Sequence, residues 1–519
     1  MGARPVVALA ALTFALGTPA CSRRAPSEPA GLVIAYPLGP ETLVNARNEE
    51  FTDSILGNAF EPLVDLDKDL AVVPGLAESW HTPDALSWVF RLRANARLHD
   101  GRPLEAREVA AVLDRVRTDP QAKRRSELTM VERIEAMDDR TLVVTTRFPF
   151  ALLPNRLANV AIVVPPGNPG APPTGTGPYR IRSWTSGGDT DLEAFDLYPG
   201  GAPPIRTVRF RAVADAQERL RLLRSGDVHL IVDAPPEETA DLVARGALRT
   251  VSRKGARILL LGLGCGEERG PHVSGARNPL TDVRVRRAIA LAIDRKGLVD
   301  RALGGEAEVV DQIVAPEVFG YDESLFGRPF DPDGARRLLR EAGAGAGFPV
   351  DLDFVRGKYR AVDVVVSRIA ADLGRVGVRV RPRPREPAVF FERFDRRESA
   401  FYFFGWMASG DAGSSYDYLL HTAAGGYGQD NAGRYSNPVV DRLIEEASRV
   451  QRPEERRKRL RAIAWKVLDD VPLVPLYRQA DLYALSAALE FEPRLDRQVR
   501  AARLRWRTPD GKPPAPKAQ

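Results

Sequence analysis

The chain has 519 residues, of which 44% are hydrophobic and 28% are charged. This length exceeds the roughly 250–300 residues at which a single hydrophobic core stops growing, so we expect two or three domains. The net charge of only +6 argues against a nucleic-acid-binding protein. The most basic run, Arg456–Arg461, follows Glu454 and Glu455 in a helical pattern and is predicted to be a solvated helix face.

The N-terminus predicts an exported protein. Arg4 precedes an uninterrupted run from Val6 to Leu16 that is almost entirely apolar. This run is too short for the ~20 residues of a membrane-spanning helix, but it is typical of a signal peptide. We therefore expect residues 1–20 to be a signal peptide and residues 21–31 to be a disordered tether.

Small residues directly before Cys21 resemble the site at which a bacterial lipoprotein receives its lipid anchor. Simple cleavage after Ala20 is the alternative. The chain has only one other cysteine, Cys265, so lipidation of Cys21 would leave no intramolecular disulfide.

The folded part is expected to begin with a buried strand at Leu32–Tyr36. A helix over residues 49–58 and a strand, turn and strand over residues 59–70 should follow. Leu86–Leu92 alternates as a half-buried strand does, and Glu105–Arg117 has the apolar spacing of a helix.

Several stretches, taken in chain order, resemble the extracytoplasmic solute-binding proteins of the dipeptide, oligopeptide and nickel class of ABC transporters, family 5. They are Glu61–Trp80, Arg97–Leu113, Gly175–Ile181 (GTGPYRI), Ala216–Asp233, Asn278–Asp294, Tyr435–Leu443 and Asp470–Tyr477. The third of these matches the GTGPY stretch of the family, and the fifth is expected to be one long helix. Together they cover most of the chain in the order that the family shows.

The resemblance implies an α/β fold of the type II periplasmic-binding-protein kind: two lobes that close like a Venus flytrap, with an extra domain inserted in the first lobe. Lobe 1 would comprise residues 32–58, 175–268 and 471–507, the inserted domain residues 59–174, and lobe 2 residues 269–470. The crossing into lobe 2 is expected after a strand at Arg257–Gly264, and the return near Asp470–Tyr477. Residues 508–519 are expected to be a disordered tail.

Catalytic and metal-binding patterns find little support. The five histidines form no HExxH motif or close pair, and His99, beside an Asp-Gly turn, is predicted to be structural. Cys265 lacks the flanking glycines of a nucleophile elbow, and neither a dinucleotide fingerprint nor a Walker motif is present. We therefore expect no enzyme activity, no cofactor and no metal site.

The segment Phe401–Asp411 (FYFFGWMASGD) is the candidate ligand site. Its aromatic run predicts a buried strand of lobe 2. A peptide ligand would bury its α-ammonium, which requires a carboxylate partner. In peptide-binding members of the family this acid lies a few residues after a Gly-Trp pair, and Asp411 occupies that place behind Gly405 and Trp406. Asp417 is the reserve candidate.

Two further residues complete the predicted site. Trp406 would offer a flat face for stacking or a cation–π contact, with core packing as the alternative. Arg356, in a loop after a lobe 2 strand, is the candidate partner for a ligand carboxylate, with a solvated surface position as the alternative.

The resemblance implies a substrate-binding component of an ABC importer, which captures a small peptide or similar solute between its lobes and delivers it to permease and ATPase subunits. We expect a monomer in the periplasm or on the outer face of the cell membrane, held there by a lipid at Cys21 if the anchor forms, and without nucleic acid. An exported hydrolase, or an exported sensory or chaperone-like receptor with the same fold, remains the alternative.

Overall fold

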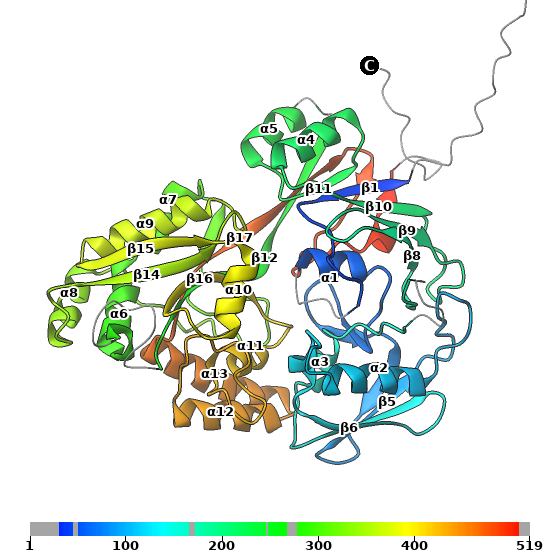
Figure 1. The fold of residues 1–519 in the computed structure, drawn as a ribbon, viewed down its shortest axis with the longest axis horizontal. Helices are drawn as coiled ribbons and strands as arrows, with labels where there is room; N and C mark the ends of the chain where they lie inside the picture. Colours follow the sequence, from blue (N-terminus) through cyan, green and yellow to red (C-terminus); the bar gives the residue numbers. More distant parts are fainter. Residues whose placement is uncertain are drawn as a thin grey trace, which may run out of the picture.

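The computed structural model describes residues 31–44, 50–165, 172–244, 246, 248–266 and 278–507. Two α/β bodies lie side by side and are joined by two long strands (Figure 1). The predicted signal peptide, most of the tether with Cys21, and the tail from residue 508 lie outside the described residues. Among the described residues, no helix combines the length and the apolar character needed to cross a membrane.

One sheet runs through both bodies in the order β15-β14-β16-β12-β17-β11-β1-β10-β9-β8, with β13 paired to β17. The strands at the lobe 1 end are β11 (Leu230–Val232), β1 (Leu32–Tyr36), β10 (Thr207–Ala212), β9 (Thr190–Ala194) and β8 (Tyr179–Trp184). The same body holds α1 (Glu50–Leu56), α4 (Ala216–Ser225), α5 (Pro236–Ala244), β18 (Leu489–Glu490), η3 (Ala501–Arg503) and β19 (Arg505–Trp506). The strand predicted at Leu32–Tyr36 is confirmed.

Lobe 2 is built on three parallel strands, β14 (Phe348–Val355), β15 (Val378–Arg385) and β16 (Phe401–Met407). One face of this part of the sheet is covered by α6 (Val283–Ala292), α7 (Arg295–Ala302), α8 (Pro332–Glu341) and α9 (Val362–Gly374). The remaining elements are β13 (Ala307–Val309), α10 (Pro387–Asp395), α11 (Ala412–Leu420), α12 (Pro438–Arg449) and α13 (Pro453–Asp470).

The predicted long helix Asn278–Asp294 is wrong in its length. It divides into a short 3-10 turn, η2 (Pro279–Thr281), and α6. The break falls at Asp282, whose backbone is extended at φ −80° and ψ 120° and whose side chain accepts a hydrogen bond from the backbone N–H of Arg284. An N-cap residue must leave the helical conformation to make this bond, so Asp282 starts a new helix instead of continuing one.

The crossing between the lobes lies within β12 (Leu248–Leu263), earlier than the strand predicted at Arg257–Gly264. The first half of β12 pairs with β17 (Leu473–Ser486) beside β11, and its second half pairs with both β17 and β16. The register between β12 and β17 shifts between Lys254 and Ile258. Such an irregularity bends a strand, which fits the place where the chain passes from one lobe to the other.

Residues 59–174, the predicted inserted domain, carry a four-stranded sheet of their own in the order β4-β5-β7-β6. Its elements are β4 (Ala77–His81), β5 (Ser87–Leu92), β6 (Val131–Ala136), β7 (Thr141–Thr146), α2 (Ala106–Thr118), η1 (Arg125–Leu128) and α3 (Leu153–Leu157), beside the hairpin β2 (Val64–Leu66) and β3 (Val72–Pro74). The predicted strand at Leu86–Leu92 and helix at Glu105–Arg117 are confirmed within one residue at each end.

The GTGPY stretch packs against the end of α1. A Cβ at Gly175 would lie 2.2 Å from the carbonyl oxygen of Ala59, so only glycine permits this approach. His99 holds the turn, since its Nδ1 accepts a hydrogen bond from Gly175 N–H at 3.3 Å and its Nε2 lies 3.1 Å from the carbonyl oxygen of Gly177. Burial lowers the pKa of His99 to about 4. Its predicted structural role is confirmed.

Candidate ligand-binding site

Strand β16 has the buried character predicted from its aromatic run. Phe401 and Phe403 point into the core of lobe 2 beneath α6 to α9, whereas Tyr402 and Phe404 pack on the opposite face with α10. Successive side chains of a strand point to opposite faces, so a strand covered on both faces is apolar along its length. The aromatic run therefore holds β16 in the middle of the lobe.

The second half of β16 has an open backbone edge. On one side the strand pairs with β12 along its whole length, from Phe401 to Met407. On the other side, the described pairing with β14 covers only Tyr402 and Phe403. Beyond them, the N–H of Gly405 donates a hydrogen bond to the hydroxyl of Tyr359 at 2.8 Å. That N–H is therefore already bonded, and an extended ligand could pair with the rest of this edge in the way that a further strand does.

Gly405 is required by the close packing across β16. A Cβ at this position would lie 2.6 Å from Cδ of Arg257 and 3.1 Å from Cε1 of Tyr359. The glycine thus lets the side chain of Arg257 lie across the strand. Arg257 forms an ion pair with Glu50 at the start of α1, so lobe 1 and lobe 2 meet beside the open edge.

Trp406 is half-buried and is held by α11. Its Nε1 donates a hydrogen bond to the hydroxyl of Ser415 at 2.9 Å, and its ring meets Tyr418 edge to face at 5.9 Å. The indole is therefore oriented by the helix that follows it. Its role in stacking against a ligand stays a prediction.

Asp411 has a charged partner that the sequence did not indicate. Its carboxylate forms two contacts with Arg456 of α13, Nε to Oδ2 at 3.0 Å and Nη2 to Oδ1 at 3.1 Å. It also caps α11 by accepting a hydrogen bond from Gly413 N–H at 2.7 Å. The negative charge is thus satisfied inside lobe 2, and binding of a ligand ammonium by Asp411 stays a prediction.

The prediction that Arg456–Arg461 is a solvated helix face is wrong at its first residue. Arg456 is 4% exposed, and besides Asp411 it donates to the carbonyl oxygen of Ala447 at 2.6 Å. The interpretation holds for Arg457, Lys458 and Arg461, which are exposed. Helical spacing turns Arg456 toward α11 and the others away from it.

Asp417 lies deep in the contact between lobe 2 and the inserted domain. It is 1% exposed and forms an ion pair with Arg156 of α3. Burial raises the pKa of this carboxyl group. As with Asp411, an arginine of the protein contacts the carboxylate, and its reserve role as a ligand partner stays a prediction.

Arg356 is a surface residue at the end of β14. Its backbone N–H donates to the carbonyl oxygen of Arg385 at 2.9 Å, and its Nε lies 3.6 Å from Glu386. These contacts are on the β15 side of β14, away from the β16 side. The structure therefore brings Gly405, Trp406 and Asp411 onto one strand and loop but does not join Arg356 to them by a contact.

Two asparagines of the inserted domain contact the loop after β16, and sequence analysis did not predict them. Asn155 donates to the carbonyl oxygen of Ser409 at 2.7 Å, and Asn159 donates to its hydroxyl at 2.9 Å. Apolar side chains continue the same contact, and Phe148 stacks on Tyr427 with ring centroids 5.5 Å apart. In both asparagine contacts the two residues are 250 or more positions apart in the chain, so no local sequence pattern could indicate them.

A buried charge network lies where the strands cross between the lobes. Arg497 contacts Glu50 at 3.0 Å and Asp481 at 2.7 Å, and it also pairs with Asp233. Burial raises the pKa of Asp481 to about 6. The network ties the start of α1 to β17 and so fixes lobe 1 to the crossing strands.

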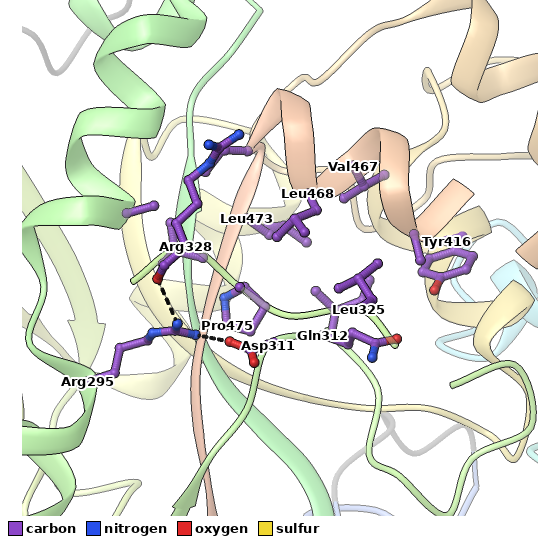
Figure 2. Close-up of a pocket in the computed structure, with 16 residues that line it drawn as sticks. Arg295, Asp311, Gln312, Leu325, Arg328, Tyr416, Val467, Leu468, Leu473 and Pro475 are labelled. Atoms are coloured by element: carbon purple, nitrogen blue, oxygen red, sulfur yellow. Dashed lines mark hydrogen bonds and ion pairs between the residues drawn. The ribbon is translucent and has the colours of Figure 1, made fainter. Parts of the chain in front are cut away.

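A separate cavity of about 50 Å³ lies inside lobe 2, between α13 and the start of β17 (Figure 2). Leu325, Val467, Leu468 and Leu473 form its apolar lining, and at one side Arg295 contacts Asp311 at 2.7 Å. Pockets for small ligands typically measure ~300–1,000 Å³. This cavity is therefore too small for a peptide. Among the described residues, no three or more His, Cys, Asp or Glu side chains are grouped to hold a metal ion.

Comparison with known proteins identifies the family. The profile of "Bacterial extracellular solute-binding proteins, family 5 Middle" matches residues 71–427, more than half of the chain. The chain belongs to this family. It is a solute-binding protein of the kind that serves ABC importers outside the cell, and the predicted two-lobed fold is confirmed.

Relatives of this family 5 protein bind peptides and related solutes. It is 27% identical over 444 residues to the glutathione-binding protein GsiB of Pectobacterium atrosepticum, covering 82% of this chain and 84% of the relative. It resembles the structure of the periplasmic binding protein DppA from Helicobacter pylori in complex with the peptide STSA, with a TM-score of 0.77, 21% identity, and 88% and 94% of the two chains covered. The oligopeptide-binding protein AppA from Bacillus subtilis, in complex with a nonapeptide, gives a TM-score of 0.77 at 20% identity, covering 92% and 99%.

Proposed function

We propose that this protein captures a small acidic peptide-like solute, of the chemical class of glutathione, and delivers it to an ABC permease. The observation that carries the proposal is that Asp411 and Asp417, the acids of the β16–α11 segment, are both paired with arginines of the protein. Both carboxylates are buried against these arginines, so neither is exposed to a cationic ligand. The glutathione-binding relatives agree with this preference.

Cations are gathered in the loop after β14, at the same end of the sheet as Gly405–Met407. Arg360 is paired with Glu306 at 2.7 Å. Arg356 has a longer contact, with its Nε 3.6 Å from Glu386, and Nζ of Lys358 lies 5.0 Å from the ring centre of Phe391. Ligands of α/β sheets bind outside the carboxyl ends of the strands, where this loop lies. A carboxylate of the solute would be held by Arg356 or Lys358.

The backbone of the solute would lie along the open edge of β16, with the ring of Trp406 as one wall. This arrangement uses main-chain hydrogen bonds, which suit peptides of different sequence. Closure of the inserted domain onto lobe 2 would bury the solute, and the closed form would dock on the permease. We further propose that the protein acts as a monomer, is held at the membrane by a lipid on Cys21, and catalyses no reaction.

Mass spectrometry of solutes released from the purified protein, followed by calorimetry, tests this function. Glutathione is the first probe, with triglycine and trilysine as neutral and cationic controls of the same length. We expect saturable binding of glutathione, weaker binding of triglycine and none of trilysine. Preferred binding of trilysine would overturn the acidic class. Chemical turnover of a bound peptide would favour the alternative of an exported hydrolase.

A further inference from the structure

A buried charge cluster joins the inserted domain to lobe 2. Arg156 of α3 forms an ion pair with Asp417 of α11, and its Nη1 lies 3.6 Å from Oε2 of Glu127 in η1. The side chains of all three residues are at most 5% exposed. Figure 1 shows α3 facing α11 and α12 across the contact between the two bodies. We call these three residues the latch cluster.

The latch cluster holds two carboxylates for one guanidinium. Tyr418 donates its hydroxyl hydrogen to Glu127 at 2.6 Å, and its ring lies 3.6 Å below the Arg156 guanidinium carbon. Asn159 donates to the other oxygen of Glu127 at 3.2 Å. Oδ1 of Asp417 is buried and has no hydrogen-bond partner among the described residues. With both acids ionised, the cluster would bury one uncompensated negative charge, which costs several kcal/mol.

Other charged groups that face the cluster do not remove this excess. Arg124 acts on Glu127 but is itself paired with Asp53. His421, at the end of α11, faces Asp417, and its Nε2 is 3.3 Å from Glu445 while its Nδ1 is 3.8 Å from Asp441 of α12. Burial raises the pKa of the Tyr427 hydroxyl, and the nearby charge of Asp417 raises it further. The Arg124 guanidinium and the His421 ring near the cluster are thus shared with further acids.

The two carboxylates come from bodies that must separate when solute enters or leaves. Glu127 and Arg156 belong to the inserted domain and Asp417 to lobe 2, which are connected through the crossing strands. In an open form, water would reach both carboxyl groups, and the pKa of each would return toward its ordinary value. In this structure, where the inserted domain contacts lobe 2, burial raises the pKa of Asp417 and that of Glu127. The closed form therefore holds more protons than the open form over the pH interval between the open-form and closed-form pKa values.

We propose that Arg156, Glu127 and Asp417 form a proton-binding latch, in which closure of the inserted domain onto lobe 2 takes up one proton from water between the two carboxyl groups. The sign follows from linkage: closure is favoured as the pH falls and opposed as the pH rises. For one proton, the ratio of closed to open molecules changes by up to about tenfold per pH unit. The latch acts through closure and does not depend on which solute is bound.

Fluorescence energy transfer in the solute-free protein tests the latch. One dye is placed at Met137→Cys in the inserted domain and the other at Val439→Cys in α12, positions that are 66% and 55% exposed. Cys21→Ser and Cys265→Ser remove the native thiols from the full chain. Between pH 8 and pH 4.5, we expect the closed fraction to rise as the pH falls, with the closed-to-open ratio changing by up to about tenfold per pH unit. An unchanged fraction over this interval would overturn the latch.

Matched variants identify the proton site. Asp417→Asn and Glu127→Gln each keep an oxygen that can accept from Arg156 or Tyr418 but leave one carboxylate for one guanidinium, so each should lose the pH response. Two variants are used so that a folding defect in one does not decide the result. Glu132→Gln, at an exposed acid of the same domain, and His421→Gln should both keep the response. A full response in both cluster variants, or its loss in His421→Gln alone, would overturn the assignment.

Discussion

Asp411 and Arg456 form a two-point ion pair in the interior of lobe 2, with Nε to Oδ2 at 3.0 Å and Nη2 to Oδ1 at 3.1 Å. The two residues are 45 positions apart in the chain, on the N-cap of α11 and in the first turns of α13. The pair joins these two helices and places the loop that follows β16. The acid that the sequence marks as a ligand partner therefore has a structural role.

Replacing Asp411 should lower stability. Asp411→Ala leaves the buried guanidinium of Arg456 without its carboxylate, which typically costs about 3–5 kcal/mol. Urea unfolding measures the loss. Asp333→Ala, which breaks an exposed pair with Arg336, should change stability by less than about 0.5 kcal/mol. If Asp411→Ala kept full stability but lost affinity for a cationic peptide, Asp411 would be the ligand partner after all.

Gly405→Ala should weaken solute binding more than it weakens the fold. The added methyl group would meet Cδ of Arg257 at 2.6 Å and displace that side chain from its place beside Glu50. We expect a loss of glutathione affinity of tenfold or more, or about 1.4 kcal/mol, by calorimetry. Gly374→Ala is the control, because no described residue lies within 4 Å of its added Cβ at the end of α9. Equal affinities in the two variants would contradict a site at the edge of β16.

Stability should fall as the pH drops from about 6.5 to 4, partly because of His99. Burial lowers its pKa to about 4, so the folded protein keeps it neutral while the unfolded chain binds a proton. The stability that neutral His99 contributes is complete above the unfolded pKa and is lost as the pH falls through this interval. The loss should reach about 2–3 kcal/mol. His229, with a pKa lowered by burial to about 4, should add a similar loss.

Urea unfolding at pH 7, 6, 5 and 4 measures this effect. His99→Gln can still donate to the carbonyl oxygen of Gly177. Between pH 7 and pH 4, its unfolding free energy should fall by about 2–3 kcal/mol less than that of the unaltered protein. His81→Gln, on an exposed histidine, is the control and should keep the full dependence. Identical slopes in all three proteins would mean that His99 is not held neutral by the fold.

Removing the cation of the latch cluster should open the protein at neutral pH. Arg156→Met leaves Glu127 and Asp417 without a guanidinium, so closure would require two protons instead of one. The closed-to-open ratio should then change by up to about a hundredfold per pH unit in the energy-transfer experiment. A slope that stays at the one-proton value would show that the two acids do not share Arg156.

The lipid anchor is tested by Cys21→Ser in cells. If Cys21 carries the lipid, the unaltered protein should incorporate radioactive palmitate and sediment with membranes, whereas the variant should appear in the soluble exported fraction. Equal distribution of both proteins would favour simple cleavage after Ala20.

The sequence by itself determined the elements that depend on neighbouring residues. Asp331 and Asn437 cap α8 and α12, accepting hydrogen bonds from Gly334 N–H at 2.8 Å and Val439 N–H at 3.0 Å, and Asp and Asn are residue types that favour this position. The aromatic run of β16 indicated its burial because hydrophobic periodicity is a local signal. The family motifs, read in order, indicated the two-lobed fold.

Only the tertiary structure decided which charges are already satisfied. Arg156 and Asp417 lie 261 positions apart, and Asp411 and Arg456 meet only after two helices have packed. A carboxylate in a sequence carries no sign of its partner, because ion pairing depends on distances that arise when the chain is folded. The sequence therefore supplied only the prediction that this segment is the ligand site, and the fold decided that its acids are paired with the protein's own arginines.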